Sequence, residues 1–185
     1  WSGLPVPAAT VSSLPTDVND FGVIVGVAFD SQMVPKAVRW TLQASGWVVE
    51  FLPRLPGDAA SYATAINNLG QVVGARGSLG YVPNGGGWLL HGITAVDLAA
   101  RYGWYVVPAD LNDQGEVIGG AERLDLVRGV VEWIGDGPAN YQPITAVAIN
   151  GTGRIAGAAA LRSTSLYVVS AFRYDPGAGW TFIAG

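Results

Sequence analysis

The stretch Ala65-Ile-Asn-Asn-Leu-Gly-Gln-Val-Val-Gly74 decides the fold, because close copies of it occur three more times along the chain. The other copies are residues 17–26 (DVNDFGVIVG), 110–119 (DLNDQGEVIG) and 148–157 (AINGTGRIAG). All share the pattern apolar-Asn-x-x-Gly-x-apolar-apolar-Gly. A nine-residue pattern that recurs in this way predicts repeated copies of one structural unit.

Each copy predicts a β-hairpin. Asparagine tolerates left-handed backbone and hydrogen-bonds its own main chain, and glycine readily takes a positive φ, so Asn-x-x-Gly is expected to form the turn. The apolar residues after the turn predict a strand. The glycine that ends each copy indicates a bulge or a close approach of another backbone segment. These glycines are Gly26, Gly74, Gly119 and Gly157.

Aromatic residues form a second landmark. Trp40, Trp88 and Trp133 each follow the asparagine of their copy by 21 residues, and Tyr174 follows Asn150 by 24. Because these tryptophans recur with the scaffold, we expect all three of them in the core between repeats.

The landmarks also place the last two strands of each repeat. Residues 37–40 and 130–133 alternate with a period of two and are expected to be third strands. Residues 47–51 are expected to be a fourth strand, and residues 141–145 match that element loosely in the third repeat. Helical periodicity is absent, with one turn at most over residues 95–102.

Repeats of about 46 residues with four strands each are typical of propeller blades. We therefore predict an all-β protein, a single four-bladed β-propeller domain over residues 1–185. The expected blades are residues 14–60, 61–107, 108–145 and 146–185, with residues 1–13 completing the ring closure. The alternatives are a five-bladed propeller or an excerpt of a longer repeat array.

The motif and the strand that follows it resemble the HAF-repeat family of bacterial extracellular proteins. The resemblance covers nearly the whole chain. The strand after which the family is named is matched best by residues 171–174 (AFRY). Ser170 stands where the family has His, and Tyr174 stands where it has Trp. Residues 36–40 (KAVRW) keep the same residue spacing, with Lys36 at the His position. The resemblance implies a secreted, propeller-like repeat protein and no catalytic residues, because the family pattern describes the scaffold.

Composition excludes several functions. The 10 basic and 14 acidic residues give a net charge of −4, which disfavours binding to nucleic acid. The chain has no cysteine and one histidine, His91, so disulfides, Cys-ligated zinc and multi-His metal sites are excluded. No apolar run approaches the roughly 18 residues of a membrane span. We expect neither membrane insertion nor a cofactor. The chain starts at Trp1 rather than Met, so we expect a processed or excised product.

Residues that the repeat does not explain are the better candidates for a binding site. The sequence Arg101-Tyr102-Gly103-Trp104-Tyr105 joins the second and third repeats. Its aromatic rings and its guanidinium group would suit a stacking platform for a sugar. The alternative interpretation is that they cap the core where two repeats meet. The glycine-rich loop that contains Tyr81 and Asn84 is a second candidate for ligand binding.

Metal and catalytic sites have weaker support. The pairs Asp17/Asp20 and Asp110/Asp113 are candidate calcium ligands, but the other two copies lack these acids, so turn chemistry explains them as well. A hydrolase would need His91 or one of the acid pairs Glu122/Asp125 and Glu132/Asp136. No Gly-x-Ser-x-Gly motif accompanies the histidine. Asn150-Gly-Thr152 matches a glycosylation acceptor but is also one of the repeated turns.

These observations predict a secreted, non-catalytic binding or scaffolding module at the cell surface or outside the cell. It is expected to recognise a polysaccharide or a surface protein through loops between blades. The alternative is a structural protein whose open strand edges self-assemble into rings or fibres.

Overall fold

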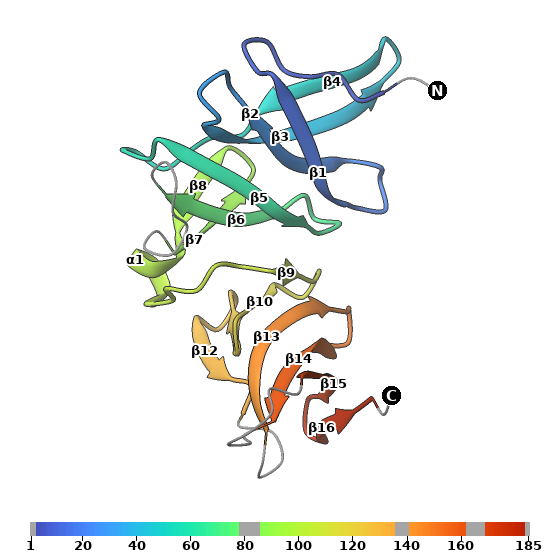
Figure 1. Ribbon diagram of the computed structural model, residues 1–185, viewed down its shortest axis with the longest axis vertical. Helices are drawn as coiled ribbons and strands as arrows, with labels where there is room; N and C mark the ends of the chain where they lie inside the picture. Colours follow the sequence, from blue (N-terminus) through green and yellow to red (C-terminus); the bar gives the residue numbers. More distant parts are fainter. Residues whose placement is uncertain (1–2, 78–85, 136–140, 162–168, 184–185) are drawn as a thin grey trace. The chain divides into compact units, whose positions relative to one another are not determined.

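The computed structural model describes residues 3–77, 86–135, 141–161 and 169–183 (Figure 1). The chain forms two compact units, Trp1–Val107 and Pro108–Gly185. Each unit contains two four-stranded antiparallel sheets, and in every sheet the strands lie in chain order.

The first unit contains sheet 1 and sheet 2. Sheet 1 comprises β1 (Ser12–Val18), β2 (Ile24–Phe29), β3 (Pro35–Gln43) and β4 (Gly46–Phe51). Sheet 2 comprises β5 (Ala60–Ile66), β6 (Val72–Gly77), β7 (Gly87–His91) and β8 (Thr94–Asp97). A single helical turn, α1 (Leu98–Tyr102), follows β8, capped by the Asp97 carboxylate at its start and by Gly103 at its end. No helix of the described residues is long and apolar enough to cross a membrane.

The second unit contains sheet 3 and sheet 4. Sheet 3 comprises β9 (Asp110–Leu111), β10 (Glu116–Gly119), β11 (Glu122–Asp125) and β12 (Val130–Trp133). Sheet 4 comprises β13 (Tyr141–Ile149), β14 (Ile155–Leu161), β15 (Val169–Asp175) and β16 (Gly179–Phe182).

The all-β prediction and the prediction of one four-stranded sheet per motif copy are therefore confirmed. The closed ring, its blade number and the single-domain arrangement remain predictions.

The strand assignment in the third repeat was wrong. Residues 130–133 form the fourth strand of sheet 3, and the third strand is β11, whose sequence Glu-Arg-Leu-Asp gives little apolar signal. The loosely matched residues 141–145 begin β13, the first strand of sheet 4, so the expected blade boundary at residue 145 falls inside a strand. The cause is the tight connection between β10 and β11, in which Gly119 pairs with Glu122.

The asparagine turn has the predicted chemistry. In the second copy, Asn67 Oδ1 accepts hydrogen bonds from the backbone N–H groups of Leu69 and Gln71, at 3.1 and 2.9 Å. Gly70 has φ +73° and donates its N–H to the Asn67 carbonyl. Equivalent bonds form around Asn19, Asn112 and Asn150. One side chain thus closes each hairpin between the first and second strands.

The glycine at the end of the motif is required by a close approach of neighbouring atoms. A Cβ atom on Gly74 would lie 1.8 Å from the Tyr62 carbonyl oxygen and 2.8 Å from the Trp88 ring. A Cβ atom on Gly157 would lie 2.3 Å from the carbonyl oxygen of Thr145. The first strands bulge beside these glycines, and a Cβ atom on Gly26 would likewise lie 2.2 Å from the carbonyl oxygen of Leu14. The prediction of a bulge or close approach is confirmed for these three glycines.

The tryptophans divide into two groups. Trp40 and Trp88 are 0% and 2% exposed, as predicted, whereas Trp133 is 57% exposed, so its core assignment was wrong. Trp133 lies on β12, the outer edge strand of its sheet, whereas Trp40 and Trp88 lie on third strands. A constant distance from the asparagine therefore does not place the three residues equivalently.

Within each unit, a carboxylate joins the two sheets. Asp17 Oδ2 of sheet 1 accepts the N–H of Ile66 in sheet 2 at 2.8 Å. Asp110 Oδ2 of sheet 3 accepts the N–H of Ile149 in sheet 4, also at 2.8 Å. The other oxygen of each carboxylate accepts the N–H of the residue that follows the aspartate. Ile66 and Ile149 lie on edge strands, where their N–H groups have no partner strand. The two aspartate side chains therefore supply the acceptors that these N–H groups need.

We expect the substitution Trp40→Ala to lower the free energy of unfolding by about 3–5 kcal/mol, because it leaves a cavity in a closed core. Trp133→Ala is the matched control and should cost less than about 1 kcal/mol, because that ring is largely in solvent. Urea denaturation of both variants measures the difference. Equal losses would contradict the burial described above.

We expect Asp110→Ala to destabilise the chain by about 2 kcal/mol, because it leaves the buried N–H of Ile149 without an acceptor. Asp110→Asn keeps one acceptor oxygen and should lose less than half of that amount. Hydrogen exchange at the Ile149 amide gives a local readout. If both variants exchanged at the wild-type rate, the carboxylate would not be holding sheet 4.

Candidate functional site

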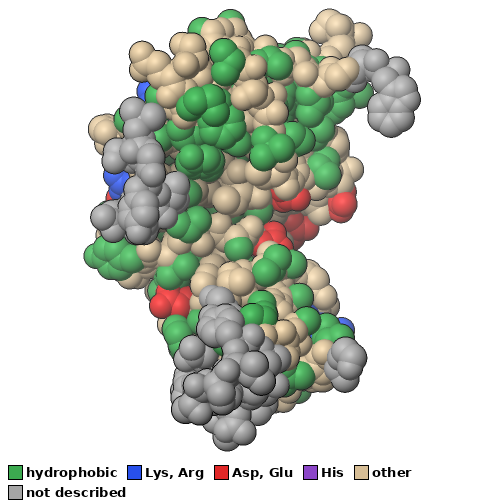
Figure 2. Space-filling view, in the orientation of Figure 1, with side chains coloured by type: hydrophobic (Ala, Val, Ile, Leu, Met, Phe, Trp, Pro, Cys, Tyr) green, Lys and Arg blue, Asp and Glu red, His purple; other side chains and the backbone are tan. Residues whose placement is uncertain are grey.

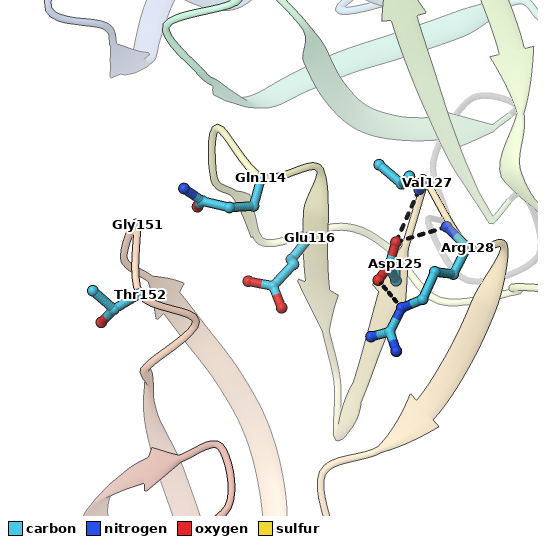
Figure 3. Close-up of a pocket in the computed structure, with 7 residues that line it drawn as sticks. All are labelled: Gln114, Glu116, Asp125, Val127, Arg128, Gly151 and Thr152. Carbon is cyan, nitrogen blue, oxygen red and sulfur yellow. Dashed lines mark hydrogen bonds and ion pairs between the residues drawn. The ribbon is translucent and has the colours of Figure 1, made fainter.

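An open pocket of about 510 Å³ lies at the turn end of the second unit (Figure 3). Three turns border it: the Asn112 turn, the Asn150 turn and the turn that joins β11 to β12. Its lining residues are Gln114, Glu116, Asp125, Val127, Arg128, Gly151 and Thr152.

The repeat backbone presents two of the polar side chains. Gln114 and Thr152 occupy the same position, two residues after the asparagine of their turns. Their N–H groups donate to Asn112 Oδ1 and Asn150 Oδ1, at 3.1 and 3.0 Å. These bonds fix the backbone and leave both residues exposed at the tips of the turns. The Thr152 hydroxyl also donates to Asn150 Oδ1 at 2.9 Å, so it offers its acceptor lone pairs to a ligand. An amide and a hydroxyl oxygen therefore stand on adjacent turns of one pocket.

The carboxylate of Glu116, which lines the pocket, is held in place by two hydrogen-bond donors. Its Oε2 accepts from Asn112 Nδ2 at 2.6 Å, and its Oε1 accepts from Arg123 Nη1 at 3.0 Å. Arg123 also pairs with Glu132 on β12, so a chain of charges crosses sheet 3. A Cβ atom on Gly153 would lie 3.1 Å from Glu116 Oε2, which shows how closely the neighbouring turn approaches this carboxylate.

Asp125 holds the third turn. Its carboxylate accepts the N–H groups of Arg128 and Val127, at 2.8 and 2.9 Å, and forms an ion pair with the Arg128 guanidinium. The backbone bond from Arg128, followed by the side-chain bond from the same residue, lowers the pKa of Asp125 below its ordinary value. Asp125 is thus an ionised acceptor at neutral pH, while the side chains of Arg128 and Val127 are exposed at the rim.

The predicted aromatic site has a different structure from the one expected. Arg101 Nε donates to the Tyr102 hydroxyl at 3.1 Å, and its guanidinium carbon lies 5.5 Å from the centre of that ring. Trp104 is 1% exposed, so its ring cannot stack on a ligand from solvent and fits the alternative of a core cap. Tyr105 is exposed. The other two candidates, Tyr81 and Asn84, lie outside the described residues.

The candidate metal ligands Asp17 and Asp110 are engaged in the bonds between sheets. Asp20 accepts from Asn68 Nδ2 at 2.8 Å. Among the described ranges, no group of three or more His, Cys, Asp or Glu side chains could hold a metal ion, and Asp113 belongs to no such group.

The candidate catalytic acids do not face one another. Glu122 and Asp125 stand three residues apart on β11, so strand alternation directs them to opposite faces. Glu132 pairs with Arg123, and its proposed partner Asp136 lies outside the described residues. His91 is exposed at the end of β7.

Sequence reasoning missed the pocket, although a signal was present. The position two residues after the motif asparagine is Phe21, Leu69, Gln114 and Thr152 in the successive copies. The scaffold does not constrain this position, and it is apolar in the first unit but polar in the second. Comparing the variable positions of the turns would have indicated a polar site on the second unit.

The chain matches no model of a known family, no curated protein and no solved structure. The resemblance to the HAF-repeat family therefore rests on the motif alone.

We expect Asp125→Asn to lower stability by about 1 kcal/mol at pH 7, because the amide loses the charge-assisted bonds to Arg128. The lowered pKa means that the wild-type advantage is fully present above about pH 4 and is lost as the pH falls through the folded-state pKa of Asp125. Urea melts of both chains at pH 7, 5 and 3 measure the gap. A gap that stays constant down to pH 3 would contradict this assignment.

Proposed function

We propose that the chain is a secreted, non-catalytic binding module whose second unit recognises a polysaccharide through the pocket at its turns. The observation that carries the proposal is that one open pocket of about 510 Å³ is lined by an amide-bearing, a hydroxyl-bearing, two carboxylate-bearing and one guanidinium-bearing residue. Sugars are bound by several hydrogen bonds from such groups, together with an apolar contact.

The charge state of the pocket favours an uncharged, hydroxyl-rich ligand. Glu116 and Asp125 each already have a cationic partner, so the pocket has little net charge to attract an ion. Carboxylates that are held as acceptors bind hydroxyl donors well. The exposed isopropyl group of Val127 supplies an apolar surface for the C–H face of a sugar ring.

The same groups support binding rather than catalysis. A general acid at neutral pH needs a raised pKa, and the pKa of Asp125 is lowered. Placement outside the cell and a propeller-like arrangement of the sheets as successive blades belong to this proposal and are supported by the repeat motif and its resemblance to the HAF-repeat family.

We expect a glycan array to select neutral oligosaccharides over sulfated or uronic-acid oligosaccharides. Titration of a selected oligosaccharide, followed by ¹H–¹⁵N NMR, should shift the amides of Gln114 and Thr152. Gln114→Ala and Thr152→Ala should each weaken binding by about tenfold, the effect of losing one hydrogen bond to the ligand. Gln43→Ala, an exposed amide on the first unit, is the matched control and should bind as the wild type does.

Two outcomes would overturn the proposal. One is an array without any ligand for the intact chain. The other is a ligand whose affinity is unchanged by both pocket substitutions.

A further inference from the structure

Each unit contains one buried interface between its sheets, and the two interfaces are built alike. Sheet 1 contributes Val25, Ala37 and Leu52 to the core that it shares with sheet 2. Sheet 3 contributes Ile118 and Ile134 to the core that it shares with sheet 4. We call this side of a sheet its receiving face, because it is covered by the first strand and motif of the next sheet.

A backbone hydrogen bond identifies the equivalent positions. Leu52 donates its N–H to the Ala37 carbonyl, Ile134 donates to Ala121, and Ile183 donates to Ala171, at 2.9, 2.9 and 3.0 Å. These bonds place Leu52, Ile134 and Ile183 at one position of the repeat. Leu52 and Ile134 are 5% and 4% exposed because the next sheet covers them, whereas Ile183 is 60% exposed.

Within the described residues of the second unit, the receiving face of sheet 4 is therefore open. Ala156 and Ala171, which correspond to the buried Val25 and Ala37 of sheet 1, are exposed. A hollow of about 400 Å³ lies on this sheet, and its lining includes Ala148, Asn150, Arg154, Ala156 and Arg173. Ala148 and Asn150 stand where Asp17 and Asn19 of sheet 1 bind sheet 2.

The complementary half of such an interface is exposed on sheet 1. In sheets 2 and 4, the first strand covers the preceding sheet with Ala63 and Ile66, or with Ala146 and Ile149. Pairing with the motif glycine identifies Pro15 and Val18 as their equivalents on β1. Both are exposed, Val18 by 57%. Hydrophobic side chains are also visible on the face of the first unit that Figure 2 shows.

We propose that the receiving face of sheet 4 binds β1 and the Asn19 turn of a second copy of this chain, head to tail. The two interfaces within the units show which element covers such a face and in which register. Charge supports the same occupant. Arg154 and Arg173 are exposed on sheet 4 and share one carboxylate, that of Asp175, so one positive charge is left over on this face. Asp20 is exposed on the Asn19 turn. Ala148 cannot form the carboxylate bond that Asp17 and Asp110 form, so this association is weaker than the pairing within a unit and is reversible.

Sedimentation velocity over a wide concentration range tests the proposal. The mass of the wild-type chain should rise above 19.2 kDa with increasing concentration, because a head-to-tail contact does not close on itself. Ala156→Arg blocks the receiving face and Val18→Arg blocks β1. Both positions are exposed, so each variant should fold, which circular dichroism and a urea melt can verify. Each variant should remain a monomer in sedimentation, because one of its two faces is blocked.

A mixture of the two variants tests directly whether the two faces bind each other. Each variant keeps the face that the other has lost, so an equimolar mixture should form a complex of twice the chain mass and nothing larger. Ile93→Arg, an exposed change away from both faces, is the control and should associate as the wild type does.

A wild-type chain that remains monomeric at every concentration overturns the proposal. The closed ring predicted from the sequence, in which the chain's own sheet 1 covers sheet 4, would give this result. A mixture of variants that forms no complex overturns it as well. The oligosaccharide titration tests the pocket at the turns, whereas sedimentation tests the receiving face of sheet 4 and β1. Either proposal can therefore fail without the other.

Discussion

The structure depends on satisfying the backbone of the edge strand where two sheets meet. A sheet that packs its first strand against a neighbour buries N–H groups that have no partner strand, and each would cost about 1–3 kcal/mol if left unpaired. Asp17 and Asp110 meet this constraint with one carboxylate each, because one oxygen serves the aspartate's own strand and the other serves the next sheet. The bond is directional, so it fixes the register of the sheets as well as their contact.

The same constraint is met separately inside each unit. Ala65 and Ala148 occupy the aspartate position in sheets 2 and 4 and have no side-chain acceptor to offer to a further sheet. The first strands of sheets 1 and 3 need no acceptor from a preceding sheet, because their own aspartates accept the N–H groups of Val18 and Leu111. The polar requirements of each pair of sheets are therefore met within that pair, which agrees with the two compact units.

Much of the fold followed from the sequence because the motif is local. Asn67, Gly70 and Gly74 act through backbone geometry within one hairpin, and that geometry was predicted correctly. The errors arose where tertiary context decides. Trp133 has the spacing of a core residue but lies on an edge strand. The turn tips gave a signal for a polar site, but the roles of Glu116 and Asp125 depend on contacts with Arg123 and Arg128 that the sequence does not show.

The alternation of aspartate and alanine has a consequence for the history of the chain. Asp17 and Asp110 differ from Ala65 and Ala148 in the same way in both halves of the sequence. This pattern is expected if a single ancestral segment doubled first, its two copies diverged, and the resulting pair was then copied as a whole. The unit of inheritance would then be two sheets rather than one, and the most recent event would have added about half of residues 1–185.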